Sequence, residues 1–228
     1  MAGNVLIVGG GITGIMTALT LNDLNIKTVI VEKDSKPGGK VRNYANIFPT
    51  FSSGRDMVTR LLESLYATSD ITLRTNTQLT KVVRENGNFQ ATLTDNQVLT
   101  IDAIILANGF EPFDPLKQPE YGYGVYPNVV TALQLENMLD PKGPTKGKIL
   151  RPSDGGPAKK IAIIFCVGSR NKRLGAPYCS RVCCSYSTKQ AIEIMKMNRH
   201  AGVTCFYMDI RTYGKKFEEM YQHAQQLG

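Results

Sequence analysis

Four of the five cysteines lie within nineteen residues of one another, a density that points to metal or redox chemistry. They are Cys166, Cys179, Cys183 and Cys184, with the spacing C-x12-C-x3-C-C. Four thiolates suit a [4Fe-4S] cluster, because soft anionic sulfur matches iron and each iron needs one protein ligand. Zinc accepts four thiolates as well, but the spacing departs from the paired C-x2-C knuckles of zinc sites and equally from common ferredoxin spacing. The type of ligand favours an iron–sulfur cluster, and a zinc site remains the alternative.

Two other interpretations of the cysteines stay open from the residues alone. Cys179 and Cys184 have the C-x4-C spacing that a redox dithiol beside a flavin can have. Four structural cysteines without a metal are the other alternative, although adjacent thiols in a Gly/Arg-rich loop are not normal core material. Cys205 differs from the four, since it lies in the apolar stretch 203–208 and is expected to be an inert buried thiol.

Residues 9–14 read Gly-Gly-Gly-Ile-Thr-Gly, a G-x-G-x-x-G fingerprint between a predicted strand and a predicted helix. In that context Gly9 allows the tight turn, Gly11 lets a pyrophosphate approach the backbone, and Gly14 lets helix and strand pack closely. The helix N-terminus supplies N–H groups and a positive dipole to the phosphates. Glu32 follows about twenty residues on, where a carboxylate accepts hydrogen bonds from a ribose diol and repels a 2′-phosphate. A tight turn without a ligand is the alternative.

The order of the following motifs favours FAD over NAD. Glu32 begins an E-x5-G-G segment that ends at Gly39, and a β-meander then leads to a strand that ends in Ala-Asn-Gly at 107–109. This order resembles the two-dinucleotide-binding-domain flavoproteins of the glutathione reductase superfamily, whose first such unit binds FAD. Their redox dithiol follows the E-x5-G-G segment, where this chain has no cysteine. The candidate FAD-binding residues are Gly9, Gly11, Ile12, Thr13, Gly14, Glu32, Lys33, Gly39, Lys40, Ala107 and Gly109.

The elements that must position the glycine fingerprint form a βαβ start. Residues 5–8 and 27–32 read as buried strands on either side of a helix over 14–23. Ser53 can cap a further helix. Short alternating segments between 71 and 101, with the hairpin turn Asn86-Gly87, predict the meander.

A second α/β region positions the cysteines. Residues 160–166 predict a strand that ends at Cys166, 185–198 a helix that Gly202 closes, and 203–208 another strand. A second glycine fingerprint, expected here in that superfamily, is missing. Cys184 is expected to reach the other cysteines through non-helical backbone. A Pro/Gly-rich stretch separates the two regions.

Composition and charge limit the partners. With 42% hydrophobic residues the chain is expected to be globular, and without a leader or a bilayer-long apolar stretch we expect it in the cytoplasm, with no direct membrane insertion. Between 142 and 200 there are 13 Lys and Arg but only Asp154 and Glu193 as acids. No aromatic residues alternate with the basic residues, and no motif of a known nucleic-acid-binding protein is present. Nucleic acid is therefore not expected as a partner. The excess of positive charge also suits bound phosphates, a thiolate cluster or acidic partner subunits. No catalytic triad or P-loop lysine is visible, and catalytic residues stay unassigned.

Several strings, in this order, resemble the flavoprotein (A) subunit of heterodisulfide reductase and its relatives. They occupy residues 110–115, 119–124, 148–155, 166–170, 178–184 and 208–212. The resemblance implies an FAD-binding electron-transfer subunit whose [4Fe-4S] cluster uses Cys166, Cys179, Cys183 and Cys184. It also implies iron–sulfur partner subunits, and we expect a homodimer.

The chain departs from the long form of that family. It lacks the C-x2-C-x2-C-x3-C ferredoxin inserts and has no cysteine before Cys166. Segment 47–51, where other members carry cysteines, favours the sulfur-oxidising branch over the quinone-interacting oxidoreductases of sulfate reducers. The expected fold class is α/β of the glutathione reductase type. Its parts are an FAD-binding Rossmann-like domain over 1–114, whose C-terminal part is expected to be missing, a linker over 115–156, and a cluster-bearing α/β unit over 157–228.

Overall fold

The computed structural model of the chain describes residues 4–228 and divides them into two compact units. The first unit contains residues 4–42 and 54–111, and the second contains 43–53 and 112–228. The sequence predicts a first domain that runs without interruption to residue 114. In the structure, segment 43–53 instead belongs to the second unit, because Ala45 packs into the hydrophobic core of that unit.

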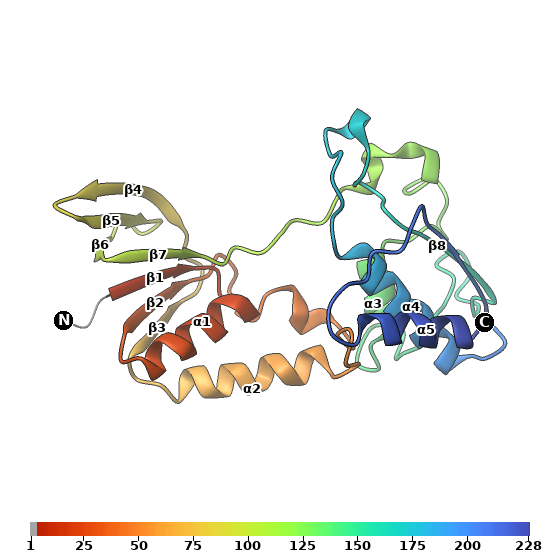
Figure 1. Ribbon diagram of the computed structural model, residues 1–228, viewed down its shortest axis with the longest axis horizontal. Coiled ribbons are helices and arrows are strands. Elements are labelled where there is room, and N and C mark those ends of the chain that lie inside the picture. The colour runs from red at the N-terminus through yellow and green to blue at the C-terminus, as the bar shows by residue number, and fades with distance from the viewer. Residues whose placement is uncertain (1–3) are drawn as a thin grey trace. The chain divides into compact units, whose positions relative to one another are not determined.

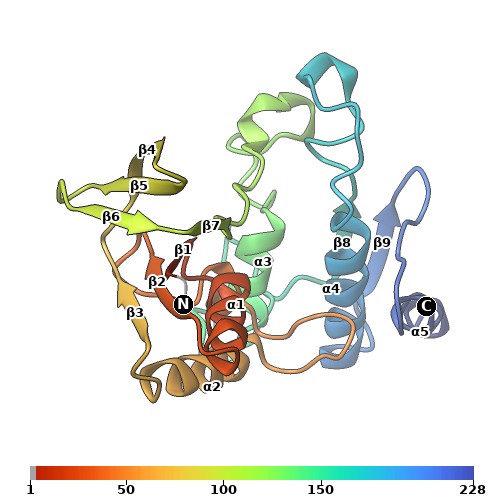
Figure 2. The ribbon, with the colours of Figure 1, turned by 60° about the vertical axis from the view of Figure 1, so that its left-hand side comes forward.

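A four-stranded parallel sheet with strand order β3-β2-β1-β7 forms the centre of the first unit (Figure 1). Its strands are β1 Asn4–Val8, β2 Lys27–Val31, β3 Ile71–Arg74 and β7 Ala103–Leu106. Helices α1 (Ile12–Asp23) and α2 (Gly54–Tyr66) cover one face. The antiparallel meander of β4 (Leu79–Glu85), β5 (Asn88–Leu93) and β6 (Val98–Ile101) covers the other face (Figure 2).

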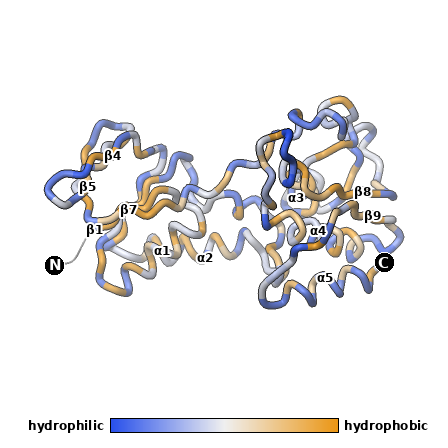
Figure 3. Tube along the Cα trace, turned by 45° about the horizontal axis from the view of Figure 1, so that its top comes forward, coloured by the Kyte–Doolittle hydropathy of each residue, from blue (hydrophilic) through white to orange (hydrophobic). Residues whose placement is uncertain are grey.

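Each face of this sheet contributes to its own hydrophobic core. Ile7 and Ile30 pack with Ile15 of α1 on the helix side. Leu6 of β1 packs with Leu93 of β5 on the meander side. A strand that is buried on both faces needs a continuous apolar run, which is why the central strands are coloured as hydrophobic in Figure 3.

The second unit contains a parallel βαβ unit with the cysteines at its first turn. Strand β8 (Lys160–Ile164) pairs with β9 (Gly202–Phe206), and helix α4 (Cys183–Met197) connects them. Helices α3 (Ala132–Leu139) and α5 (Phe217–Gln226) complete the regular structure of this unit, together with the short 3-10 turns η2 (Pro115–Lys117), η3 (Pro119–Tyr121) and η4 (Lys172–Leu174). Helix α3 forms within 115–156, where the sequence predicts a linker, and Leu135 and Leu139 of this helix pack against Ile194 of α4.

Three details of this unit correct the expectations from the sequence. Strand β8 ends at Ile164, so Cys166 lies beyond the strand, and exposed residues alternate along β8 with partly buried ones. Helix α4 begins at Cys183, so Cys184 is helical. Helix α4 ends at Met197 with Asn198 as its C-cap, so Gly202 does not close the helix and is instead the first residue of β9. Among residues 4–228, no helix combines the length and the hydropathy that a membrane span needs.

Candidate functional site

The glycine fingerprint forms the turn from β1 into α1. Gly9 has a φ of +114°, and a Cβ atom there would lie 2.3 Å from the carbonyl oxygen of Ala107. A Cβ atom on Gly14 would lie 1.9 Å from the carbonyl oxygen of Gly9. A side chain at either position would have to displace the neighbouring backbone. The packing of the chain therefore requires glycine at both positions, whether or not a ligand binds.

Gly11 differs, because the chain leaves room beside it. The nearest atom to a Cβ on Gly11 would be the Cα of Gly39, at 3.8 Å, which is an ordinary van der Waals contact. Gly11 is the N-cap of α1 and contributes no side chain to cap the first turn, which contains Ile12 and Thr13. Gly11 thus places no side chain over the N-terminus of α1, an arrangement that fits a pyrophosphate.

Glu32 follows directly after β2 and is 7% exposed. Its Oε2 accepts a hydrogen bond from the N–H of Gly10 at 2.7 Å, and its Oε1 accepts one from the N–H of Asp34 at 2.9 Å. The carboxylate therefore holds the glycine loop in place. Each oxygen keeps a further lone pair, which is available to a ribose hydroxyl.

Glu111 joins two of the predicted site lysines, a role that sequence reasoning missed. Its carboxylate lies 3.2 Å from Nζ of Lys33 and 4.0 Å from Nζ of Lys40. The hydrogen bond from Lys33, followed by the charge of Lys40, lowers the pKa of Glu111. The N–H of Ala107, directly after β7, donates to the carbonyl of Val8, and Gly109 follows with a φ of +68°. The predicted residues of the first unit thus gather at the carboxyl ends of β1, β2 and β7.

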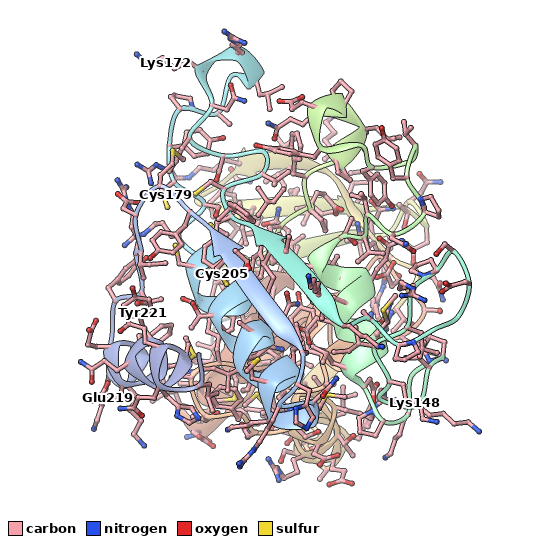
Figure 4. The ribbon with its side chains drawn as sticks, turned by 90° about the vertical axis from the view of Figure 1, so that its right-hand side faces the viewer. Lys148, Lys172, Cys179, Cys205, Glu219 and Tyr221 are labelled. Atoms are coloured by element: carbon pink, nitrogen blue, oxygen red, sulfur yellow. The ribbon has the colours of Figure 1, made fainter. Side chains whose placement is uncertain are left out.

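The cysteines gather where the loop after β8 meets the start of α4. The sulfur atoms of Cys166 and Cys183 are 3.9 Å apart. The N–H of Arg181 donates to Cys179 Sγ, and the N–H of Arg211 donates to Cys184 Sγ, each at 3.3 Å. Hydrogen bonds from backbone amides to thiolate sulfur are the contacts that adjust the potential of iron–sulfur clusters. Figure 4 labels Cys179 and Lys172 on this loop and Cys205 on β9.

The side chains are close without forming a finished metal site. Among the described residues, no three His, Cys, Asp or Glu side chains stand together in an arrangement that could hold a metal. Burial raises the pKa of Cys166 to about 11, with further contributions from Cys183 and Cys184. Burial also raises the pKa of Cys184, to which Cys183 and Cys179 contribute in the same direction. All four thiols are therefore linked by electrostatic interactions, and in the metal-free chain those of Cys166 and Cys184 are protonated at neutral pH.

The backbone of the cysteine loop is strained at three positions. Cys166, Arg170 and Arg181 have positive φ angles of 59°, 55° and 65°, a conformation that residues other than glycine rarely adopt. Such residues persist only where the surrounding structure holds them, and they concentrate at functional sites. A Cβ atom on Gly168 would lie 2.1 Å from the ring of Phe113, so the loop packs closely against segment 112–121.

Two arginines of the loop tie it to the segment that follows β9. Arg170 forms an ion pair with Asp209, which also pairs with Arg211 at 3.2 Å. Arg181 donates a hydrogen bond to the hydroxyl of Tyr213 and lies 5.0 Å from the centre of its ring. Neither Asp209 nor Tyr213 was identified from the sequence as a partner of these arginines.

A cavity of about 560 Å³ opens beside Cys166 at the carboxyl ends of β8 and β9. Its lining includes three basic residues, Arg170, Lys172 and Arg173, and no acidic residue. The carboxyl end of a parallel sheet is where proteins of this architecture bind ligands. Cys166 therefore has access to solvent, whereas Cys183 and Cys184 are 4% and 3% exposed.

A buried polar group on α4 was also missed from the sequence. The residue Lys189 is 1% exposed. Its Nζ lies 2.5 Å from Oε1 of Glu136 and 3.1 Å from Oε2 of Glu193. The same Nζ donates a hydrogen bond to the carbonyl of Asn46 at 3.0 Å. Burial raises the pKa of Glu193, and Lys189 opposes that shift. This network joins α3, α4 and segment 43–53. Glu136 and Lys189 are 53 residues apart, so local spacing gives no signal for their contact.

Comparison with known proteins supports the resemblance inferred from the residues. The A subunit of the H2:CoB-CoM heterodisulfide,ferredoxin reductase of Methanothermobacter thermautotrophicus is 30% identical over 97% of this chain and 46% of its own length. The H2/formate-dependent counterpart of Methanococcus maripaludis is 32% identical over 96% and 45%. An iron-sulfur A subunit of the CoB–CoM heterodisulfide reductase of Methanopyrus kandleri is 31% identical over 97% and 46%. The chain thus spans about half the length of these curated relatives.

The family match covers both the glycine fingerprint and the strand before the cysteines. Residues 3–164 match the pyridine nucleotide-disulphide oxidoreductase family. The matched region includes the sheet and meander of the first unit together with β8 of the second. These observations confirm the predicted resemblance to the A subunit of heterodisulfide reductase. The chain belongs to the pyridine nucleotide-disulphide oxidoreductase family.

Proposed function

We propose that this chain is an electron-transfer subunit of a heterodisulfide-reductase-like complex and passes electrons between FAD and a [4Fe-4S] cluster in sulfur or thiol–disulfide metabolism. The observation that carries the proposal is the group of four thiols around the start of α4, in a chain that also has a dinucleotide fingerprint. The names of its relatives, one of them an iron-sulfur subunit, support the same role. FAD exchanges two electrons and a cluster exchanges one, so the pair can convert between the two.

In this proposal the first unit holds FAD. Gly9, Gly11 and Gly14 place the pyrophosphate at the N-terminus of α1, and Glu32 receives the ribose hydroxyls. The room for a Cβ atom at Gly11 supports this assignment, because no contact within the chain requires a glycine there. Ile12, Thr13, Lys33, Gly39, Lys40, Ala107 and Gly109 line the same edge of the sheet.

The second unit holds the cluster through Cys166, Cys179, Cys183 and Cys184. The backbone N–H groups of Arg181 and Arg211 donate hydrogen bonds to the sulfurs of Cys179 and Cys184, and such contacts to the ligand sulfurs would help to set the potential of a bound cluster. Arg170 and Arg181 place positive charge beside the site, which offsets the negative charge of four thiolates and raises a reduction potential. The strained backbone at Cys166 also supports a ligand role, since it fixes the direction of that side chain.

The domain boundaries and partners follow from the same proposal. The FAD-binding domain is the first unit, and the cluster-bearing domain lies within the second. The partners are other iron–sulfur subunits of the complex, and the chain itself forms a homodimer. Five free thiols suit a reducing compartment, so we place the protein in the cytoplasm.

Two alternatives make different predictions. A self-contained dithiol oxidoreductase that uses Cys179 and Cys184 contains no iron, and the contact between Cys166 and Cys183 favours a different pair. An assembly module with a structural metal shows no flavin absorbance and no reducible centre. Iron, zinc and flavin contents therefore separate the three functions.

The test is an ultraviolet–visible and EPR spectrum of anaerobically prepared protein with metal and flavin analysis. Serine at Cys166, Cys179, Cys183 or Cys184 should lower the iron content or change the EPR signal, whereas Cys205→Ser should do neither. Zinc in place of iron, or equal tolerance of all five substitutions, refutes the cluster assignment.

The flavin assignment has its own pair of variants. Gly11→Val should abolish flavin retention, because the side chain fills the space proposed for the pyrophosphate. Gly202→Val is the control, since a Cβ atom there has no neighbour closer than 4.0 Å and lies outside the first unit. Equal flavin occupancy in both variants refutes the assignment.

A further inference from the structure

The four thiols around the start of α4 do not have equivalent neighbours. The sulfurs of Cys179 and Cys184 receive hydrogen bonds from the backbone N–H groups of Arg181 and Arg211. The sulfurs of Cys166 and Cys183 contact each other at 3.9 Å. This contact makes Cys166 and Cys183 a candidate pair for a covalent bond.

The neighbouring pair Cys183 and Cys184 is a poorer candidate. Adjacent Cα atoms are about 3.8 Å apart, which is below the range of about 4.4–6.8 Å that disulfides span. Both residues also belong to the first turn of α4, and its helical backbone would have to distort. Cys166 and Cys183 are 17 residues apart, and the loop between them contains Gly168 and Gly175, both with positive φ angles. Gly175 has no atom within 4 Å of a Cβ position, so this part of the loop has space to adjust as the two sulfurs approach to a bond length of about 2 Å.

The two thiols also differ in access. Cys166 is partly exposed and lines the 560 Å³ cavity, so a small reagent can reach its sulfur. Cys183 is 4% exposed and lies behind it. An accessible thiol next to a shielded one is the arrangement in which the first reacts with an external disulfide and the second resolves the product.

We propose that Cys166 and Cys183 form a disulfide in the cluster-free chain and that this bond prevents cluster loading until it is reduced. The first part depends only on the geometry of the two thiols. The second part rests on the proposed function, because it removes two of the four proposed ligands.

The oxidant is a low-molecular-weight disulfide. The sulfur of Cys166 bonds to one sulfur of the reagent, whose S–S bond breaks and releases one thiol. The sulfur of Cys183 then bonds to the sulfur of Cys166, which breaks the mixed disulfide and releases the second thiol. The chain loses two electrons and two protons, and the reagent gains both.

The first experiment treats the metal-free 228-residue chain with oxidised glutathione at about pH 9, where a larger fraction of the attacking thiol is ionised than at neutral pH, and maps disulfides by mass spectrometry. The expected product is a crosslink between the peptides of Cys166 and Cys183. Cys183→Ser should leave Cys166 joined to glutathione, because the resolving thiol is gone. Cys205→Ser is the matched control, since Cys205 packs in the same hydrophobic cluster but should not affect the crosslink. Crosslinks through Cys179, Cys184 or Cys205 in its place, or no crosslink, overturn the proposal.

The second experiment compares iron uptake by the oxidised and the reduced chain during anaerobic reconstitution. The oxidised chain should take up about tenfold less iron, because two ligands are unavailable, and a reductant should restore uptake. Equal uptake by both forms overturns the block on loading. A mapped disulfide in a chain that takes up no iron even when reduced refutes the cluster of the proposed function and leaves the disulfide established.

Discussion

Replacing Lys189 with methionine removes the positive charge that two buried carboxylates share. Its Nζ lies 2.5 Å from Oε1 of Glu136 and 3.1 Å from Oε2 of Glu193, and the side chain is 2% exposed. Removing one partner of a buried ion pair costs about 3–5 kcal/mol, because the remaining charge has no compensation. For a chain of this length each kcal/mol corresponds to about 2–4 °C, so the thermal midpoint should fall by about 6–20 °C.

This loss of stability should depend on pH. Burial raises the pKa of Glu193, and Lys189 lowers it, so the Lys189→Met variant raises that pKa further. A carboxyl group with a raised folded pKa destabilises the fold above that pKa, and the penalty disappears below its unfolded value of about 4.3. The variant should therefore lose most stability at pH 8 and less at pH 5.

The assay is thermal unfolding followed by circular dichroism between pH 5 and pH 8. Lys196→Met is the matched control, because Lys196 lies on the same helix, is exposed and makes a cation–π contact with Phe51 that is worth about 0.5–1 kcal/mol. Adding Glu136→Gln to Lys189→Met should recover part of the loss, since one uncompensated charge is removed. A midpoint within about 2 °C of wild type, or an equal loss at pH 5 and pH 8, would refute this account of the network.

Three further predictions concern other parts of the chain. Gly14→Ala should cost about 1–3 kcal/mol in urea unfolding, because its Cβ would lie 1.9 Å from the carbonyl oxygen of Gly9 and must separate α1 from β1; an unchanged midpoint contradicts that contact. Since the pKa of Cys166 is raised to about 11, its alkylation by iodoacetamide should accelerate about tenfold per pH unit between pH 7 and pH 10; a plateau near pH 9 in peptide mass spectrometry contradicts the shift. Asp209→Asn should change the unfolding midpoint little, because the Asp209 side chain is 46% exposed, but should speed amide hydrogen exchange at Arg211; unchanged exchange means that Asp209 does not hold this segment.

Much of the first unit was predictable because its determinants are local. The apolar run of β1, the fingerprint and the helix α1 follow one another without a break, so their order alone predicts a βαβ turn. Asn86 and Gly87, with φ angles of 50° and 88°, form the hairpin turn that their residue types predict. The grouping of four cysteines in one loop is likewise visible in the sequence.

The boundaries around the cysteines were less predictable, because Cys and Ser are weak helix formers and the apolar period begins only later. The sequence predicts the helix from 185, whereas packing against Phe165 and Cys166 extends α4 back to Cys183. The eight-residue helix α3 was hidden in a Pro/Gly-rich stretch. It forms because Thr131 and Gln134 make a capping box and because two of its leucines pack against α4.

Residue types and their spacing were enough to predict a glycine-rich turn of the dinucleotide-binding type, an acidic residue after the second strand and a thiol-rich loop. Which of these groups come into contact depends on the tertiary structure. It brought Cys166 to Cys183, Asp209 to Arg170, and Lys189 to Glu136 across 53 residues. Contacts between residues far apart in the chain depend on how helices and strands pack. Side-chain type and local spacing do not predict that packing.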